Sequence, residues 1–174
     1  MEEFFENQNH TLNEIKNLFK GSKNIVKSVS DFIEEHGQLQ KQYLELIRER
    51  AKLVKAKLIS DIEKTPVNNG IRFLSTKIDF NHLDEIKNIH FQLTKDYTDL
   101  VLVTGYELDG AAGLTGSTST ELVKDKNIDM GKIIRESAAV MKGNGGGQKF
   151  FAQGKGPELS SLDNAINKAK TLLQ

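Results

Sequence analysis

Four glycines fall within five positions between Gly143 and Gly147, and Gln148 follows them. Lys142 and Lys149 flank this segment. Glycine tolerates positive φ and leaves the backbone amides open to close approach by a partner. A glycine-rich segment between two lysines therefore predicts a loop that cradles phosphate or packs against a ribose. The alternative interpretation is a flexible linker or a tight turn.

The glycine segment does not match the two common nucleotide-binding motifs. A Walker A loop ends in Lys followed by Ser or Thr, and no such pair follows Gly147. The dinucleotide fingerprint follows a strand, whereas this segment follows a predicted helix. Any nucleotide contact here is therefore expected to be of another kind.

Charge is distributed unevenly along the chain. The formal net charge is zero, from 24 basic and 24 acidic residues, which excludes a uniformly basic nucleic-acid-binding protein. Between residues 131 and 155, however, Glu136 is the one acidic residue beside five basic ones, a local balance of five minus one, or +4. This segment predicts a local basic patch, formed by Lys132, Arg135, Lys142, Lys149 and Lys155.

Residues suited to catalysis or metal binding are not arranged for it. The absence of cysteine excludes disulfides, a thiol nucleophile and Cys-containing zinc sites. Ser117 to Thr120 lack the context of a nucleophile, and Glu107 and Asp109 are expected in a hairpin. The histidines have no metal-site spacing and are expected at the surface or half buried: His10, His36, His82 and His90. We therefore expect no catalytic residue, metal or cofactor in this chain.

The chain shows no membrane or export signal. It has no apolar run of about 18 residues, as a membrane span requires. Its start, MEEFFENQNH, is acidic and polar, unlike a signal peptide. Together with the lack of cysteine, this predicts a cytoplasmic location.

The elements that would position these residues begin with helices. A first helix is predicted from apolar residues at helical spacing, and Gly21 suits its end: Phe4, Phe5, Leu12, Ile15, Leu18 and Phe19. Residues 39–62 then carry two adjacent rows with a period near 3.5, one marked by Leu39, Tyr43, Leu46 and Leu53 and the other by Ile47, Val54, Leu58 and Ile62. This stripe predicts either a helical hairpin with the first helix or a subunit interface.

A break at residues 65–70, with Pro66 and Asn-Asn-Gly, predicts a domain boundary. We assign residues 1–65 to a helical linker or oligomerisation segment and 70–174 to a globular domain. The second part predicts strands at 71–78, 100–103 and 111–115, a turn at 108–110, and a strand containing Phe150 and Phe151, of which one is expected inside. Helices are predicted from an Asn81 cap to Lys95, over 119–126, from an Asp129 cap to Met141, and over 161–172. The fold class is therefore α+β with a small mixed sheet.

The segment from Ala138 to Gly154 resembles the glycine motif near the C-terminus of alanyl-tRNA synthetases, which also belongs to the DHHA1 domain found beside DHH phosphoesterases. Gln148, Ala152, Gln153 and Gly154 match this motif, whereas Lys149 replaces its usual proline. The order of helical linker, strand 99–103, turn, helix, glycine segment and final helix fits the same family. The resemblance covers essentially the whole chain.

The resemblance implies a C-terminal tRNA-binding and oligomerisation module that begins in the linker after the editing domain. It implies tRNA(Ala) as partner, a homodimer through the N-terminal helices, and a parent ligase that uses ATP, Mg and Zn in other domains. The expected nucleic-acid-binding residues are Lys132, Arg135, Lys142, Gly145, Gly146, Gly147, Gln148, Lys149, Phe150 and Gln153. The alternatives are the substrate-binding domain of a DHH-type phosphoesterase and a purely structural dimerisation domain.

Overall fold

The computed structural model describes residues 2–19, 22 and 24–173, with side chains from residue 7 onward. The chain forms two compact units, Met1–Leu46 and Ile47–Gln174. The helix end predicted at Gly21, and the side chains of Phe4 and Phe5 in the predicted apolar face, lie outside the described residues and side chains. Within the described ranges, no helix is both long enough and apolar enough to span a bilayer.

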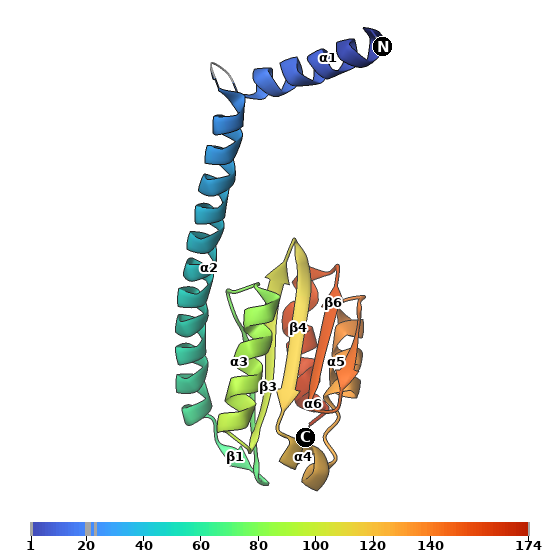
Figure 1. Cartoon of the computed structure of the whole chain (residues 1–174). Helices are drawn as coiled ribbons and strands as arrows, with labels where there is room; N and C mark the ends of the chain where they lie inside the picture. The colour runs from blue at the N-terminus through green and yellow to red at the C-terminus, as the bar shows by residue number, and fades with distance from the viewer. Residues whose placement is uncertain (1, 20–21, 23, 174) are drawn as a thin grey trace. The chain divides into compact units, whose positions relative to one another are not determined.

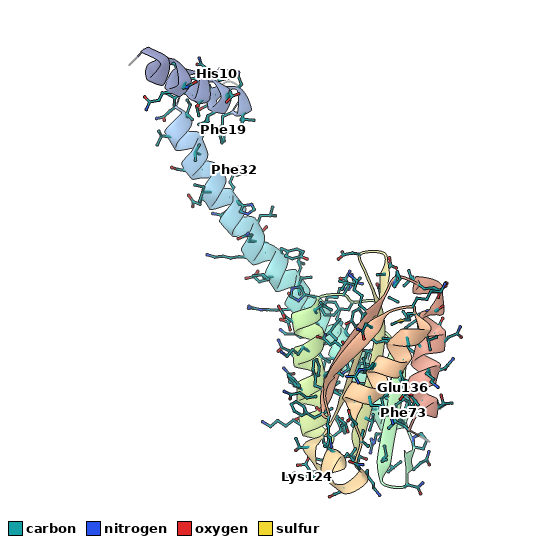
Figure 2. All side chains as sticks on the ribbon, turned by 90° about the vertical axis from the view of Figure 1, so that its right-hand side faces the viewer. His10, Phe19, Phe32, Phe73, Lys124 and Glu136 are labelled. Atoms are coloured by element: carbon teal, nitrogen blue, oxygen red, sulfur yellow. The ribbon has the colours of Figure 1, made fainter. Side chains whose placement is uncertain are left out.

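The first unit contains α1 (Glu2–Leu18) and the start of α2 (Ile25–Lys64). Asn24 begins α2, because its Oδ1 accepts a hydrogen bond from the amide of Lys27 at 3.1 Å. The rings of Phe19 and Phe32 meet edge to face, with centroids 6.3 Å apart (Figure 2). Both predicted helices are present, but α2 starts 14 residues before the predicted Leu39 (39 minus 25).

The second unit is built on one six-stranded mixed sheet in the order β1-β2-β3-β4-β6-β5 (Figure 1). Only β2 and β3 pair in parallel, and every other neighbouring pair is antiparallel. The strands are β1 (Val67–Asn68), β2 (Ile71–Lys77), β3 (Leu100–Leu108), β4 (Ala111–Thr118), β5 (Asn144–Gln148) and β6 (Phe151–Gly156). The predicted α+β class and mixed sheet are confirmed.

Helices cover both faces of this sheet (Figure 1). Besides α2, the helical elements of this unit are α3 (Leu83–Asp96), α4 (Thr120–Lys126), α5 (Met130–Val140), the 3-10 turn η1 (Leu159–Ser161) and α6 (Leu162–Thr171). One core joins α5 and α6 to the inward face of β3, β4 and β6. The other core joins α3 and the C-terminal part of α2 to the opposite face.

The apolar stripe of α2 divides between two environments. Leu58 and Ile62 are buried in the cluster that holds Ile86 and Leu93 of α3, and Val54 packs against this cluster. The sequence analysis left a hairpin with the first helix and a subunit interface as alternatives for this stripe, and its buried row packs instead on α3 and the sheet. The other row is exposed: Leu39, Tyr43, Leu46 and Leu53 are between 56% and 72% accessible.

Helix ends test the capping predictions directly. Asp129 caps α5 as predicted, because its Oδ1 accepts a hydrogen bond from the amide of Lys132 at 3.0 Å. The Ser119 hydroxyl caps α4 in the same way through Leu122 at 3.2 Å. Asn81 does not cap α3: His82 occupies the N-cap position and makes no side-chain capping bond.

Candidate nucleic-acid interface

The glycine segment is a strand rather than the predicted loop. Residues 144–148 form β5, which lies at the end of the sheet and pairs antiparallel with β6. A Cβ on Gly147 would collide with the backbone of Phe151 and Ala152, and one on Gly145 would lie 2.9 Å from the Cα of Gly154. The missing side chains therefore let β5 approach β6 closely. Composition alone does not show whether a glycine-rich segment forms such a closely packed strand or a loop.

Helix α5 also approaches β5 closely. A Cβ on Gly131 would lie 2.9 Å from the carbonyl oxygen of Gly147. The carbonyl of Lys149, in the turn after β5, accepts a hydrogen bond from the amide of Met130 at 2.9 Å. Strand β5 and its turn are thereby fixed to the first turn of α5, which carries exposed Lys132.

Arg135 lies beside the glycine strand. Its Nη2 is 3.4 Å and its Nε 3.9 Å from the position that a Cβ on Gly146 would occupy. The residue is exposed, as is Lys149 at the end of β5. The structure therefore brings a guanidinium group against Gly146, the middle one of three consecutive glycines in β5. Guanidinium nitrogens and backbone amides both donate hydrogen bonds that phosphate oxygens accept.

Lys142 has a partner within the chain. Its Nζ donates to Oε1 of Glu158 at 3.2 Å, and this bond lowers the pKa of the Glu158 carboxyl, aided by a hydrogen bond from Ser161. The backbone of Lys142 has a φ of 54°, the left-handed conformation that often ends a helix. Lys142 is one of the cations of the predicted basic patch. Its backbone is therefore fixed at the end of α5, and its ammonium group is bonded to Glu158.

Phe150 and Phe151 do not alternate between core and solvent as predicted. Phe150 lies in the turn, Phe151 begins β6, and both are half buried. Their rings gather around Phe91 of α3, with centroids 6.5 Å and 4.9 Å from that ring. The backbone turn places both rings on the α3 side of the sheet, where a strand alternation would have separated them.

Gln153 takes part in a polar cluster. Its Nε2 donates to Oγ1 of Thr115 at 3.3 Å, and the Thr115 hydroxyl lies 3.0 Å from the hydroxyl of Tyr106. Burial raises the pKa of Tyr106, and the hydrogen bonds to Thr115 and Gln153 oppose that rise. Gln153 therefore bonds to its direct partner on the neighbouring strand β4, and its side chain is half buried.

His90 is completely buried, contrary to the expected surface or half-buried position. Its Nδ1 lies 2.7 Å from the hydroxyl of Ser117 and its Nε2 lies 2.8 Å from that of Thr104. Desolvation by burial lowers the pKa of His90 to about 3. The imidazole is thus neutral near pH 7 and joins α3 to two strands.

Lys87 and Phe91 on α3 lie beside the predicted site, although the sequence analysis did not select them. The Lys87 ammonium is 5.8 Å from the ring centroid of Phe91 and 6.0 Å from that of Phe151. A signal was present, because Lys87, Phe91 and Lys95 follow one another at intervals of four residues, which places them on one helix face.

A groove of about 830 Å³ lies at the turn between β3 and β4. Two of the cations that line it are already paired, Arg50 with Asp79 at 2.6 Å and Lys77 with Asp163 at 2.8 Å. Its charges therefore favour no single class of ligand. Across residues 2–19, 22 and 24–173, no group of three or more His, Cys, Asp or Glu side chains is placed to hold a metal ion.

Comparison with known proteins gives consistent relatives. The chain is 37% identical over 171 residues to the alanine–tRNA ligase of Christiangramia forsetii. This alignment covers 98% of this chain and 19% of that protein. It is 35% identical over 173 residues to the alanine–tRNA ligase of Cytophaga hutchinsonii, with 99% and 19% covered. The chain thus spans about a fifth of the length of these curated relatives.

The fold has a solved counterpart in the C-Ala domain from Aquifex aeolicus alanyl-tRNA synthetase. The TM-score is 0.55 at 21% sequence identity, and the match covers 62% of this chain and 95% of that domain. The family model described as the DHHA1 domain matches residues 70–174, which contain the sheet from β2 to β6 and the cations around β5. The chain therefore belongs to the DHHA1 domain family.

Proposed function

We propose that this chain is the tRNA-binding and oligomerisation module of an alanine–tRNA ligase. Its role is to hold tRNA(Ala) so that other domains of the ligase can charge and edit the acceptor end. In this proposal residues 70–174 bind the tRNA, and residues 1–65 form the linker and the contact between copies. The similarity to alanine–tRNA ligases over 98% of the chain supports the choice of tRNA as partner.

The observation that carries the proposal is the position of Arg135 over the bare backbone of Gly146. Lys132 on the same helix and Lys149 in the turn after β5 are also exposed. Phosphate contacts of this kind fix the position of an RNA without reading its sequence. A module that presents a folded tRNA to other domains requires this kind of contact.

Salt-dependent binding tests the proposal. Each phosphate that a protein cation neutralises releases counterions, so the slope of log affinity against log salt scales with the number of such contacts. Changing Arg135 and Lys149 to Ala should weaken binding of a tRNA(Ala) transcript and make this slope shallower by roughly one to two units. Fluorescence anisotropy titrations at several salt concentrations measure both quantities.

A control pair of cations comes from α2. Lys52 and Lys57 are exposed, and changing both to Ala removes the same charge from a helix on the opposite face of the sheet. This variant should keep the wild-type slope. If the Arg135 and Lys149 variant also keeps the wild-type affinity and slope, the proposal is wrong. A purely structural dimerisation domain instead predicts no binding at any salt concentration.

A further inference from the structure

Helix α3 presents an aromatic ring beside the turn that follows the glycine strand. Phe91 is 37% exposed, although it is a large apolar residue. Its ring packs in tilted geometry against the rings of Phe151, with centroids 4.9 Å apart, and Phe150, with centroids 6.5 Å apart. Phe150 and Phe151 lie at a turn whose Lys149 carbonyl accepts a hydrogen bond from the amide of Met130 in α5. The two rings that contact Phe91 are therefore held in place by the backbone.

A hollow of about 250 Å³ lies next to this ring. The size is slightly below the range of roughly 300–1,000 Å³ that holds drug-sized ligands, which suits one planar group. Phe91 and Phe150 supply its apolar wall, and Glu121 is its acidic residue. The remaining wall is mostly hydroxyls, with one cation: Thr94, Thr98, Thr118, Ser119, Thr120 and Lys95.

Three lysines lie near the ring, line the hollow or precede Phe150 in the turn. Lys87 lies 5.8 Å from the centroid of Phe91, Lys95 lines the hollow, and Lys149 directly precedes Phe150. The hollow itself is lined by one cation and one acid, Lys95 and Glu121, so the additional cations near the ring are Lys87 and Lys149. An apolar protein side chain would gain nothing from these cations, whereas a base linked to phosphates matches both the ring and the charge.

We propose that one unpaired RNA base stacks on Phe91 and that its flanking phosphates lie among Lys87, Lys95 and Lys149. The base edge then faces the hydroxyls of the hollow. Those of Thr94 and Thr118 already donate to backbone carbonyls of the chain, so toward a base they act as hydrogen-bond acceptors. Stacking needs a base whose face is free, so a loop or a single strand can bind here and a continuous duplex cannot. The choice of RNA rests on the proposed function, but the ring and the hollow are observed independently of it.

A tryptophan reporter tests the stacking. The chain contains no Trp, so Phe91→Trp places a single indole at the proposed contact and keeps an aromatic surface. Its fluorescence should be quenched by a tRNA(Ala) transcript and by a short oligoadenylate strand, but not by a blunt RNA duplex. Val67→Trp is the matched control, because Val67 is 48% exposed on β1, at the opposite end of the sheet from β5.

Affinity measurements complete the test. Phe91→Ala should weaken binding of the transcript between about 5-fold and about 150-fold, the range expected for loss of one stacked base. The salt slope should stay unchanged, because no charge is removed. Phe91→Leu fills nearly the same space without a π face, so it should show the same loss if the effect comes from stacking and not from misfolding.

The outcomes separate this inference from the proposed function. If the transcript binds but Phe91→Trp is not quenched and Phe91→Leu binds as tightly as wild type, the stacking inference is overturned and the proposed function stands. If oligoadenylate quenches the reporter while the transcript does not bind, the inference is supported and the proposed function fails. If the reporter emission changes with protein concentration in the absence of RNA, Phe91 contacts another copy and the inference is overturned.

Discussion

A neutral imidazole, that of His90, is buried in the second unit between α3 and two strands. His90 is fully buried, and both of its ring nitrogens lie within hydrogen-bonding distance of hydroxyls, on Ser117 and Thr104. Two buried hydroxyls that would otherwise lack a partner are thereby satisfied. The arrangement depends on the protonation state, because a charged imidazole cannot accept a bond from either hydroxyl.

We expect His90 to make the fold acid-sensitive. Its folded pKa of about 3 lies below the ordinary value of 6.5, so the unfolded chain binds the proton more tightly. The contribution of His90 to the free energy of unfolding is therefore fully present above pH 6.5. It is lost progressively as the pH falls from 6.5 toward 3. Urea unfolding at pH 7 and pH 5 should show that His90→Gln loses about 2 kcal/mol less than wild type over this interval.

His36→Gln is the control for this measurement, since His36 is exposed on α2. It should follow the wild-type decline between pH 7 and pH 5. The His90 variant itself should be less stable at pH 7 by about 1–3 kcal/mol, because at least one buried hydroxyl loses its partner. Equal declines for wild type and His90→Gln would show that the imidazole does not control the acid response.

At the scale of elements, the glycine strand is the feature on which the candidate interface depends. Gly147 faces the backbone of β6, whereas Gly146 faces the flexible end of Arg135. Two adjacent positions of one strand therefore differ in what a methyl group would meet. Backbone atoms cannot yield without separating the strands, but a long side chain can move aside.

Alanine substitution should distinguish these two positions. Gly147→Ala should lower the free energy of unfolding by at least about 2 kcal/mol, because the added methyl group overpacks against Phe151 and Ala152. Gly146→Ala should change it by less than about 1 kcal/mol. Thermal and urea unfolding of both variants measures the difference. Comparable stability of the two would mean that close packing is not what the glycines provide.

The elements that could be predicted were those with local signals. The Asp129 cap and the Asp109–Gly110 turn depend on residues adjacent in sequence, and Asp109 and Gly110 have φ values of 52° and 76° as such a turn requires. The strand at 144–148 could not be predicted, because glycine disfavours strands intrinsically. What stabilises β5 is pairing with β6 and contact with α5, which are tertiary effects.

The candidate site was predictable in the same partial way. The cations on α5 and around the glycines followed from residue type, but the pairing of Lys142 with Glu158, 16 residues later, did not. His90 meets Thr104 and Ser117, which are 14 and 27 residues away. Such separations are set by the sheet order, which the periodicity of a single sequence does not contain.

At the scale of the whole molecule, the exposed apolar row of α2 is a surface that packs on no other part of the described chain. Leu39, Leu46 and Leu53 are 63%, 64% and 72% exposed and recur every seven residues, the repeat of helices that pack on one another. Leu46→Glu with Leu53→Glu should lower the sedimentation mass at equal concentration. The melting temperature of a monomer should change little, because neither side chain is buried within the chain.

Lys41→Glu with Arg48→Glu serves as the control, since both residues are exposed and lie on the other side of α2. This variant should keep the wild-type mass. Sedimentation of the wild-type chain as a monomer at every concentration tested would contradict the oligomerisation role proposed for the N-terminal helices, while leaving the RNA-binding proposal to its own test.

The two ends of the sheet have a consequence for the behaviour of the chain at high concentration. An unpaired strand edge is a template on which other chains can add strands and start amyloid-like stacks. Here one end is β1, only two residues long and directly after Pro66, and the other is β5, five residues that include three glycines. Shortness, proline and glycine all make an edge a poor template. The molecule is therefore protected against edge-to-edge aggregation at both ends of its sheet.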